Sequence, residues 1–288
     1  MTYNCENIDW ISFLNDKKVC NKDAIKFFEL VISRKGYVSG GFARVLANQL
    51  LHKNKSDIFS IEGTLKKYIT PRSNVDFNNP LFRKGGAGDV DIFFKNKEHA
   101  MITKDSVISE LNPQYCRNTI AYFGYDIYYG NTSFQLITKI NGTPEDVLNT
   151  FDISNAKVYL DEQGIHYSDE WKELEEKRLL GIDISNKPNI LWRVRKWLSK
   201  HSYVDLRPGD HEKIVDALYE AADKINDQSL IRYNKPVTIF ELRSIIKKFI
   251  YISPPSQIIK ASLLLDSYSQ MTALNSLSYS YKFQNCEI

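Results

Sequence analysis

The sequence is poor in cysteine, and its cysteines follow no pattern typical of a zinc site or a disulfide framework. Its 288 residues include four cysteines, scattered without a Cys-x-x-Cys pair or a Cys/His cluster, and five histidines without metal-ligand spacing. Zinc sites and disulfide-rich folds both need closely patterned ligands or pairs, so both classes are disfavoured. We expect a protein of the reducing cytoplasm.

Long apolar runs are also missing. A membrane-spanning helix needs roughly 20 consecutive apolar residues, and no stretch approaches that length. The N-terminus carries Asn4, Glu6 and Asp9 where a signal peptide would have a basic start and an apolar block. The sequence therefore predicts no secretion and no membrane partner.

The net charge of +3 is too small to identify a nucleic-acid binder by itself, because such binders are recognised by local clustering of Lys and Arg.

Two aspartates, Asp89 and Asp91, lie one residue apart in the strand-like run Gly88-Asp89-Val90-Asp91-Ile92-Phe93-Phe94. Residues i and i+2 of a strand point to the same face, so both carboxylates leave one face while the apolar residues fill the other. Two carboxylates this close repel each other and are costly to desolvate. They call for a cation, most naturally oxygen-preferring Mg²⁺.

A glycine pair, Gly40 and Gly41, lies upstream in a predicted strand-to-helix turn. Residues 36–39 have the pattern of a short strand, and the apolar residues from Phe42 to Leu50 have helical spacing. The N–H groups at a helix start carry partial positive charge, and glycine lets an anion approach without a Cβ in the way. Ser39, Gly40 and Gly41 are therefore predicted to bind phosphate.

Asp152 is the third carboxylate of interest. It lies in Phe151-Asp152-Ile153, predicted as a strand that follows a helix beginning at Pro144. Three carboxylates can hold two Mg²⁺ ions, which activate an attacking hydroxyl and neutralise a leaving pyrophosphate. In this scheme Asp89 and Asp91 bridge both ions, and Asp152 holds the ion beside the attacking hydroxyl. The alternative for Asp152 is a cap of a helix or strand end.

These residues also carry a resemblance to a known family. Ser39-Gly40-Gly41, Asp89-Val90-Asp91 and Phe151-Asp152 together resemble the signature of the DNA polymerase β superfamily of nucleotidyltransferases. The run from Gly40 to Leu46 is similar to the glycine-arginine motif of CCA-adding enzymes and poly(A) polymerases. Residues 134–137 and 144–152 resemble nucleotidyltransferase-like proteins of phages and large DNA viruses. The resemblance covers about residues 36–160.

The departures from that family are informative. The spacing from Gly41 to Asp89 implies an insertion, and Val45 follows Arg44 where CCA-adding enzymes have an acidic residue. Their downstream base-selecting motif, an acidic pair with a trailing arginine, is missing. CCA specificity is therefore not predicted.

The pattern predicts an α/β (α+β) nucleotidyltransferase domain with a mixed sheet over residues 1–165, followed by an all-α domain over 166–288. Helices are expected in the second domain at 171–180, 190–200, 211–225, 237–250 and 256–268. A basic insertion spans about residues 52–88. It is either a solvated surface segment or a basic flap over a polyanion.

Basic residues outside the insertion have two interpretations as well. Arg193, Lys196 and Lys200 follow helical spacing, so they form either a stripe that holds triphosphate or RNA, or an ordinary solvated helix face. Leu191, Val194 and Leu198 are expected to pack inward, and Trp192 and Trp197 to pack in a core or between domains rather than to stack on bases. Arg44 either contacts the nucleotide phosphates or pairs with an acid on its own helix.

The leading hypothesis is a Mg²⁺-dependent, template-independent nucleotidyltransferase that adds NMP from an NTP to an RNA 3′ end, such as that of tRNA. A second hypothesis keeps the fold and transfers NMP to a hydroxyl of a protein or a small molecule. A third is a catalytically inert nucleic-acid-binding module on the same scaffold. The intact carboxylates count against the third, because a dead enzyme gains nothing from acids around an empty metal site.

Overall fold

The computed structural model describes residues 2–17, 22–51, 90–118, 123–130 and 132–183, with 194, 197, 203, 205–210, 212 and 213 beyond them. The chain forms two compact units. The first is Met1–Phe151 with Asn155–Glu175, and the second is Asp152–Ser154 with Glu176–Ile288. The change of pattern in the sequence predicts a boundary near residue 165. The predicted insertion at 52–88 and Asp89 lie outside the described residues.

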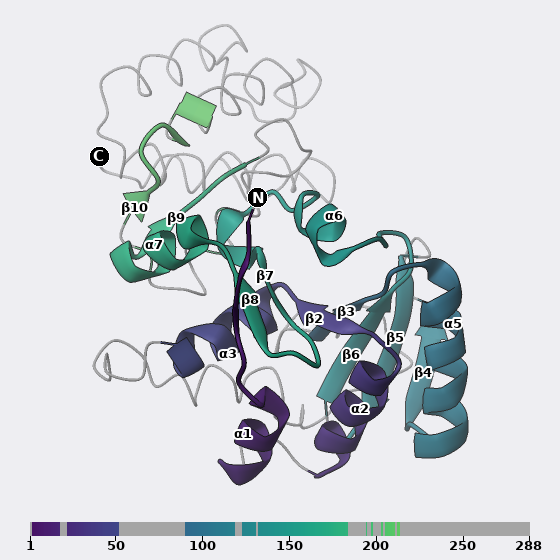
Figure 1. Ribbon diagram of the computed structural model, residues 1–288. Helices are drawn as coiled ribbons and strands as arrows, with labels where there is room; N and C mark the ends of the chain where they lie inside the picture. Colours follow the sequence, from purple (N-terminus) through teal and green to yellow (C-terminus); the bar gives the residue numbers. More distant parts are fainter. Residues whose placement is uncertain are drawn as a thin grey trace, which may run out of the picture. The chain divides into compact units, whose positions relative to one another are not determined.

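A mixed sheet forms the centre of the first unit (Figure 1). Its strand order is β1-β8-β7-β2-β3-β6-β5-β4. Within the described part of the sheet, β3 and β6 run parallel, and the other neighbours run antiparallel. The strands are β1 (Asn4–Glu6), β2 (Tyr37–Ser39), β3 (Val90–Phe93), β4 (Tyr115–Asn118), β5 (Gly124–Tyr129), β6 (Thr132–Ile137), β7 (Val158–Leu160) and β8 (Ile165–Tyr167). The predicted mixed sheet is confirmed.

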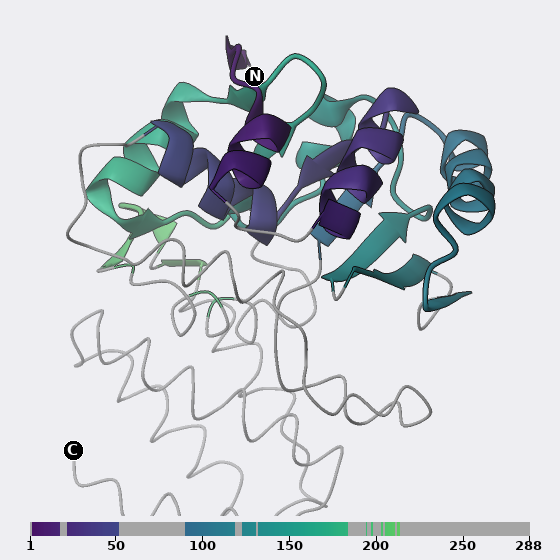
Figure 2. The same ribbon diagram turned by 90° about the horizontal axis from the view of Figure 1, so that it is seen from below.

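Most helices of the first unit pack their apolar sides against one face of this sheet, whereas Val147 and Leu148 pack on the other face with Tyr37, Phe93 and Tyr159. In Figures 1 and 2, α1 and α2 lie side by side over it. The helices are α1 (Trp10–Asp16), α2 (Lys22–Ser33), α3 (Gly41–Leu51), α5 (Lys97–Ser106), its π-helical continuation η2 (Val107–Leu111), α6 (Pro144–Leu148) and α7 (Asp169–Lys177). Among the described residues, no helix is both long enough and apolar enough to cross a membrane.

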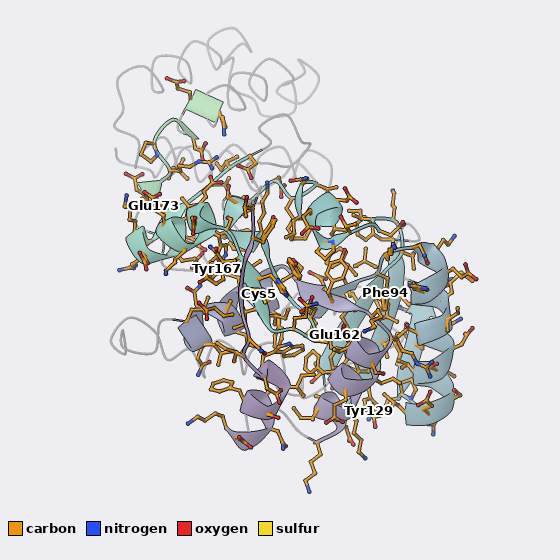
Figure 3. All side chains as sticks on the ribbon, viewed as in Figure 1. Cys5, Phe94, Tyr129, Glu162, Tyr167 and Glu173 are labelled. Atoms are coloured by element: carbon orange, nitrogen blue, oxygen red, sulfur yellow. The ribbon has the colours of Figure 1, made fainter. Side chains whose placement is uncertain are left out.

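The core between these helices and the sheet follows from the strand alternation. Val90, Ile92 and Phe94 are fully buried, as the period of two predicts. The ring of Phe27 on α2 stacks on that of Phe134 on β6, with centroids 3.8 Å apart. Phe94 and Tyr129, both labelled in Figure 3, belong to the same cluster. Burial on this face leaves the alternate residues of each strand on the opposite face.

The opposite face carries a row of side chains that crosses all eight strands at one level. Each member is paired in register with the next. In order, this cross-strand row consists of Cys5, His166, Tyr159, Ser39, Asp91, Gln135, Asp126 and Arg117. Nearly all its members are polar, and Asp91 lies in its centre on β3. The row is the sheet feature that positions the candidate site.

The second unit contains a short parallel pair, β9 (Leu179–Leu180) with β10 (Asp205–Leu206). The predicted helix at 171–180 therefore ends earlier, at Lys177. Residue 178 has a positive φ of 57°, which ends the helix and leads into β9. Val194 and Trp197 are buried, as predicted. The other residues of the helix at 190–200, and nearly all of the three later ones, lie outside the described residues.

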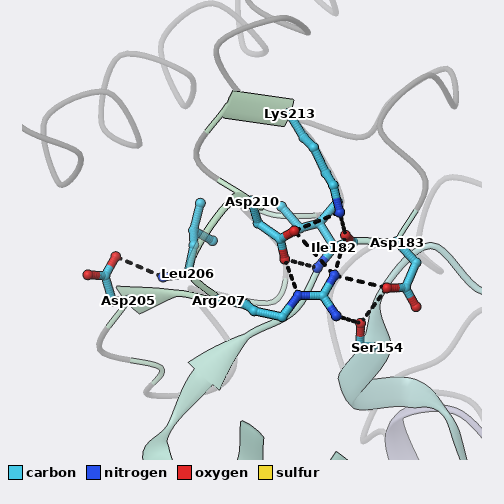
Figure 4. A network of polar contacts seen from close by, with 8 residues as sticks. All are labelled: Ser154, Ile182, Asp183, Asp205, Leu206, Arg207, Asp210 and Lys213. Carbon is cyan, nitrogen blue, oxygen red and sulfur yellow. Dashed lines mark hydrogen bonds and ion pairs between the residues drawn. The ribbon is translucent and has the colours of Figure 1, made fainter. Parts of the chain in front are cut away.

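An ionic cluster around Arg207 holds the described part of the second unit together (Figure 4). Its guanidinium donates to Asp210 and Asp183, each at 3.0 Å, and to the carbonyl of Ile182 at 2.8 Å. Burial lowers the pKa of Arg207, but hydrogen bonds and charge from Asp210 and Asp183 outweigh it and raise the pKa overall. The guanidinium is thus a charged structural centre.

Candidate active site

The glycine turn and the Asp91 carboxylate lie against each other. Residue 39, at the end of β2, pairs in register with Asp91 on β3, and Gly40 follows immediately. A Cβ placed on Gly40 would lie 3.1 Å from Oδ2 of Asp91. Gly40 also has a φ of +82°, a conformation that residues with a Cβ rarely adopt. Asp91 of β3 therefore lies directly beside the glycine turn.

Helix α3 begins at Gly41, directly after this turn, and its first helical hydrogen bond runs from the Arg44 N–H to the Gly40 carbonyl. The N–H groups of a first helical turn make no intrahelical bond and favour anions. Gly40, Gly41 and Asp91 thus combine an anion-favouring helix start with a carboxylate that can bind a cation. These two features suit a metal–phosphate complex, which carries both a positive and a negative charge.

Replacing Gly40 with alanine should weaken nucleotide binding beyond its effect on folding. The backbone strain of a Cβ at positive φ costs about 1–2 kcal/mol, and here the Cβ also crowds the Asp91 carboxylate. Gly209→Ala is the matched control, because Gly209 has a φ of +86° and a Cβ placed on it would have no neighbouring atom within 4 Å. Both variants should lose thermal stability, whereas only Gly40→Ala should raise the Kd for an NTP, measured by calorimetry. Equal Kd values for the two variants would contradict this placement.

Ser39 is fully buried, and its hydroxyl donates to the carbonyl of Val158 at 2.7 Å. The bond links β2 to β7, which are neighbours in the sheet. Because the hydroxyl proton is used between strands, Ser39 fixes the position at which β2 ends and the turn begins.

Arg44 forms a bidentate ion pair with Glu175 on α7. Its Nε and Nη2 donate to the two carboxylate oxygens at 2.8 and 2.6 Å. Asn48, one turn along α3, and Asn155 also donate to Glu175, at 2.6 and 2.7 Å. The side chains of Arg44 and Glu175 are 11% and 3% exposed. The partner acid thus comes from another helix, and the pair fixes the start of α3.

Asp152 does not lie on a strand, which corrects the sequence prediction. It occupies a bend between α6 and an isolated bridge of Ile153 with Ile182. The apolar residues Phe151 and Ile153 favour a strand in the sequence. In the structure Phe151 packs against the cluster that contains Phe93, whereas Ile153 pairs with Ile182. The Asp152 carbonyl accepts from the Asp183 N–H at 3.0 Å, and its side chain is nearly fully buried. Asp152 belongs to the second unit, so its convergence with Asp91 stays a prediction.

Asp89 and the basic stripe of Arg193, Lys196 and Lys200 lie outside the described residues. Among the residues that the structure does describe, no three His, Cys, Asp or Glu side chains gather as a metal-binding set. The chemistry of Asp91 nevertheless fits Mg²⁺, which is commonly held by one or two carboxylates plus substrate phosphates. Because residue 40 is a glycine, no Cβ lies between the turn and the Asp91 carboxylate. Asp91, with Asp89 and Asp152 as further proposed ligands, would hold such an ion.

Sequence reasoning missed Gln135, Asp126 and Glu175. Gln135 pairs with Asp91 across β6 and β3, and its amide donates to Asp126 at 2.9 Å. Glu175, on helix α7, had no sign of its role in the sequence. For Gln135 and Asp126 the only sign was a polar residue at an alternate position of each strand. Their adjacency depends on strand register, which separate apolar patterns do not fix.

The fold resembles that of CCA-adding enzymes. The chain is similar to the Thermotoga maritima CCA-adding enzyme complexed with tRNA, with a TM-score of 0.50 and 12% identity, covering 98% of this chain and 64% of that one. It is also similar to a CCA-adding enzyme in complex with CTP, with a TM-score of 0.50 and 12% identity, covering 98% and 65%. The chain therefore spans less than two thirds of the length of either enzyme. At this identity the likeness concerns the fold.

The family is defined more closely by sequence. Residues 7–177 match the Gabija anti-defense 2 family, Gad2, and the chain belongs to that family. This match covers more than half of the chain and includes the glycine turn, Asp91 and Glu175. No curated protein matches the sequence.

Proposed function

We propose that this protein is a Mg²⁺-dependent nucleotidyltransferase that transfers NMP from an NTP to an acceptor hydroxyl. The observation that carries the proposal is the close approach of the Gly40 turn to the Asp91 carboxylate. A phosphate-binding turn beside a cation-binding acid is the arrangement that a metal–triphosphate complex requires. The fold likeness to CCA-adding enzymes supports the same reaction class.

In the proposed reaction each residue has a definite task. The start of α3 binds the triphosphate through its N–H groups, while Ser39 and the Arg44–Glu175 pair keep that turn in place. Asp91, with Asp89 and Asp152, holds the divalent cations. When bound, the cations lower the pKa of the attacking hydroxyl and offset charge on the leaving pyrophosphate. The acceptor hydroxyl gives up its proton, which Asp152 helps to accept, and its oxygen bonds to the α-phosphorus. The bond from that phosphorus to the oxygen that bridges to the β-phosphate breaks, and pyrophosphate leaves.

For the acceptor we propose an RNA 3′ end, such as that of tRNA. The basis is the likeness to a CCA-adding enzyme that was solved with tRNA, together with the basic residues at 52–88 and 193–200. Cationic segments bind an RNA backbone chiefly through phosphate charge, so this binding should weaken steeply with salt.

A second acceptor class is favoured by the family to which the chain belongs. The family description names the Gabija defence system, so the proposed acceptor in this class is a component of that system. Transfer of NMP to a serine, threonine or tyrosine hydroxyl of a Gabija protein would place a bulky charged group on its surface. Such a modification can block an interface or an active site.

The experiment that tests the proposal offers donor and acceptor together. The full chain is incubated with Mg²⁺ and each α-³²P-labelled NTP in turn, in the presence of total cellular RNA or of purified Gabija proteins. Label in RNA that is lost on 3′-exonuclease digestion supports the RNA acceptor, and label on a Gabija protein supports the second class. Absence of label from both acceptors, with all four NTPs and with Mn²⁺ in place of Mg²⁺, would refute transfer to them.

A further inference from the structure

Three polar side chains continue the cross-strand row from Asp91 toward the edge strand β4. Gln135 lies opposite Asp91 on the neighbouring parallel strand, Asp126 lies opposite Gln135, and Arg117 lies opposite Asp126. Gln135 Nε2 donates to Asp126 Oδ1 at 2.9 Å, and Arg117 Nε lies 3.7 Å from Asp126 Oδ2. We call these three residues the amide link.

Each part of the amide link is held in place. Asp126 is 8% exposed, and both of its carboxylate oxygens face a donor within the link. The guanidinium carbon of Arg117 also lies over the ring of Tyr115, 5.2 Å from the ring centroid. An ionised carboxylate only accepts hydrogen bonds, so the NH₂ group of the Gln135 amide must point toward Asp126. Asp126 therefore fixes the orientation of the Gln135 amide beside β3.

The order of charges along the link is the informative point. From β3 outward it reads acid, neutral amide, acid and cation, at Asp91, Gln135, Asp126 and Arg117. Neighbouring strands lie about 4.8 Å apart, so Asp126 is about 10 Å from Asp91 along the sheet. At that distance Asp126 adds little to the field at Asp91, whereas an acid at position 135 would add much.

We propose that Gln135 is a positioning residue that sets the charge beside Asp91, with Asp126 and Arg117 holding its amide. This inference rests on the proposed function. The neutral amide keeps the second acid of the row one strand away from the metal-binding carboxylate. The site therefore binds a divalent cation weakly by itself and takes it together with the nucleotide, whose phosphates complete the coordination. The ligand recognised is a metal–NTP complex rather than a free metal ion.

A charge exchange tests this directly. The double variant Gln135→Glu/Asp126→Asn keeps one amide and one carboxylate in the pair, so the hydrogen bond is retained with donor and acceptor exchanged. The variant also keeps the net charge and moves the negative charge one strand closer to Asp91. Binding of Mn²⁺ to the full chain is measured from the electron paramagnetic resonance signal of free Mn²⁺, with and without a non-hydrolysable NTP analogue.

The wild type should bind Mn²⁺ weakly without nucleotide and more tightly with it. The exchanged variant should bind Mn²⁺ alone about tenfold more tightly, because a charge on the adjacent strand is felt strongly. The nucleotide should then improve Mn²⁺ binding less than in the wild type. An unchanged Mn²⁺ affinity in a variant that melts like the wild type would overturn the inference.

A single variant covers the case in which the exchanged pair fails to fold. Asp126→Asn should weaken Mn²⁺ binding by no more than about fivefold, since it removes a charge two strands away. A larger loss would make Asp126 itself a ligand and would overturn the inference. Asp91→Asn separates the two levels of the proposal: if it leaves Mn²⁺–nucleotide binding intact, the proposed function fails. If it abolishes that binding while the exchanged variant behaves like the wild type, only the role of Gln135 fails.

Discussion

Replacing Asp91 with asparagine is expected to abolish nucleotidyl transfer while leaving the protein folded. Asparagine has the same shape but no charge, so it binds a divalent cation beside the Gly40 turn much more weakly. Loss of a charge that stabilises the transferring phosphate should reduce the rate on the order of a thousandfold or more. The rate is measured as labelled NMP incorporated per minute at saturating NTP, and folding is followed by thermal melting.

Glu98→Gln provides the control for this variant. Glu98 is an exposed acid in the first turn of α5, and its replacement removes one negative charge without touching the row that contains Asp91. Its rate should remain within about twofold of the wild type, as is usual for a surface substitution far from a site. Transfer by Asp91→Asn at a rate near that of Glu98→Gln would rule out the metal-binding role of Asp91.

Removing the Glu175 carboxylate should have the largest effect on stability. In Glu175→Ala the buried Arg44 guanidinium loses its two bonds to that carboxylate, and the amides of Asn48 and Asn155 each lose an acceptor. An uncompensated charge in such surroundings costs about 3–5 kcal/mol. Urea unfolding should therefore show a midpoint that falls sharply in Glu175→Ala. Glu176→Ala, which replaces the exposed acid one position along α7, should stay close to the wild type.

The double variant Arg44→Leu/Glu175→Leu distinguishes a charge effect from lost packing. Replacing both partners of a buried pair with apolar residues removes the unpaired charge, so much of the stability should return. The amides of Asn48 and Asn155 remain without their acceptor, so recovery should be partial. A double variant as unstable as Glu175→Ala would show that the pair is not the source of the loss.

The local features of the fold were predictable because each is determined by neighbouring residues. Alternating apolar residues define β3 and β6, and the glycines before Phe42 define the turn into α3. Pro144 begins α6 as predicted, with a Thr143–Asp146 capping box. The position of Asp91 beside Gly40, by contrast, depends on the pairing of β2 with β3, which local patterns do not fix.

The features that depend on distant pairing were not predictable from one sequence. Arg44 is 131 positions from Glu175, and no periodicity links helix α3 to helix α7. The strand predicted at Asp152 is wrong for the same reason, because the partner of its apolar neighbour Ile153 is Ile182 rather than a strand of the main sheet. Gln135 and Asp126 were overlooked because their importance arises only from register with Asp91.

The central claim is that a metal–nucleotide complex binds where the Gly40 turn meets Asp91. Mn²⁺ bound with a non-hydrolysable NTP analogue broadens the NMR signals of nearby amides, so titration into ¹⁵N-labelled protein locates the ion directly. We expect the amide signals of Gly40, Gly41 and Asp91 to disappear first, while those of Ser12 and Phe13 on α1 persist. Broadening that begins elsewhere and spares the Gly40 turn would contradict the claim.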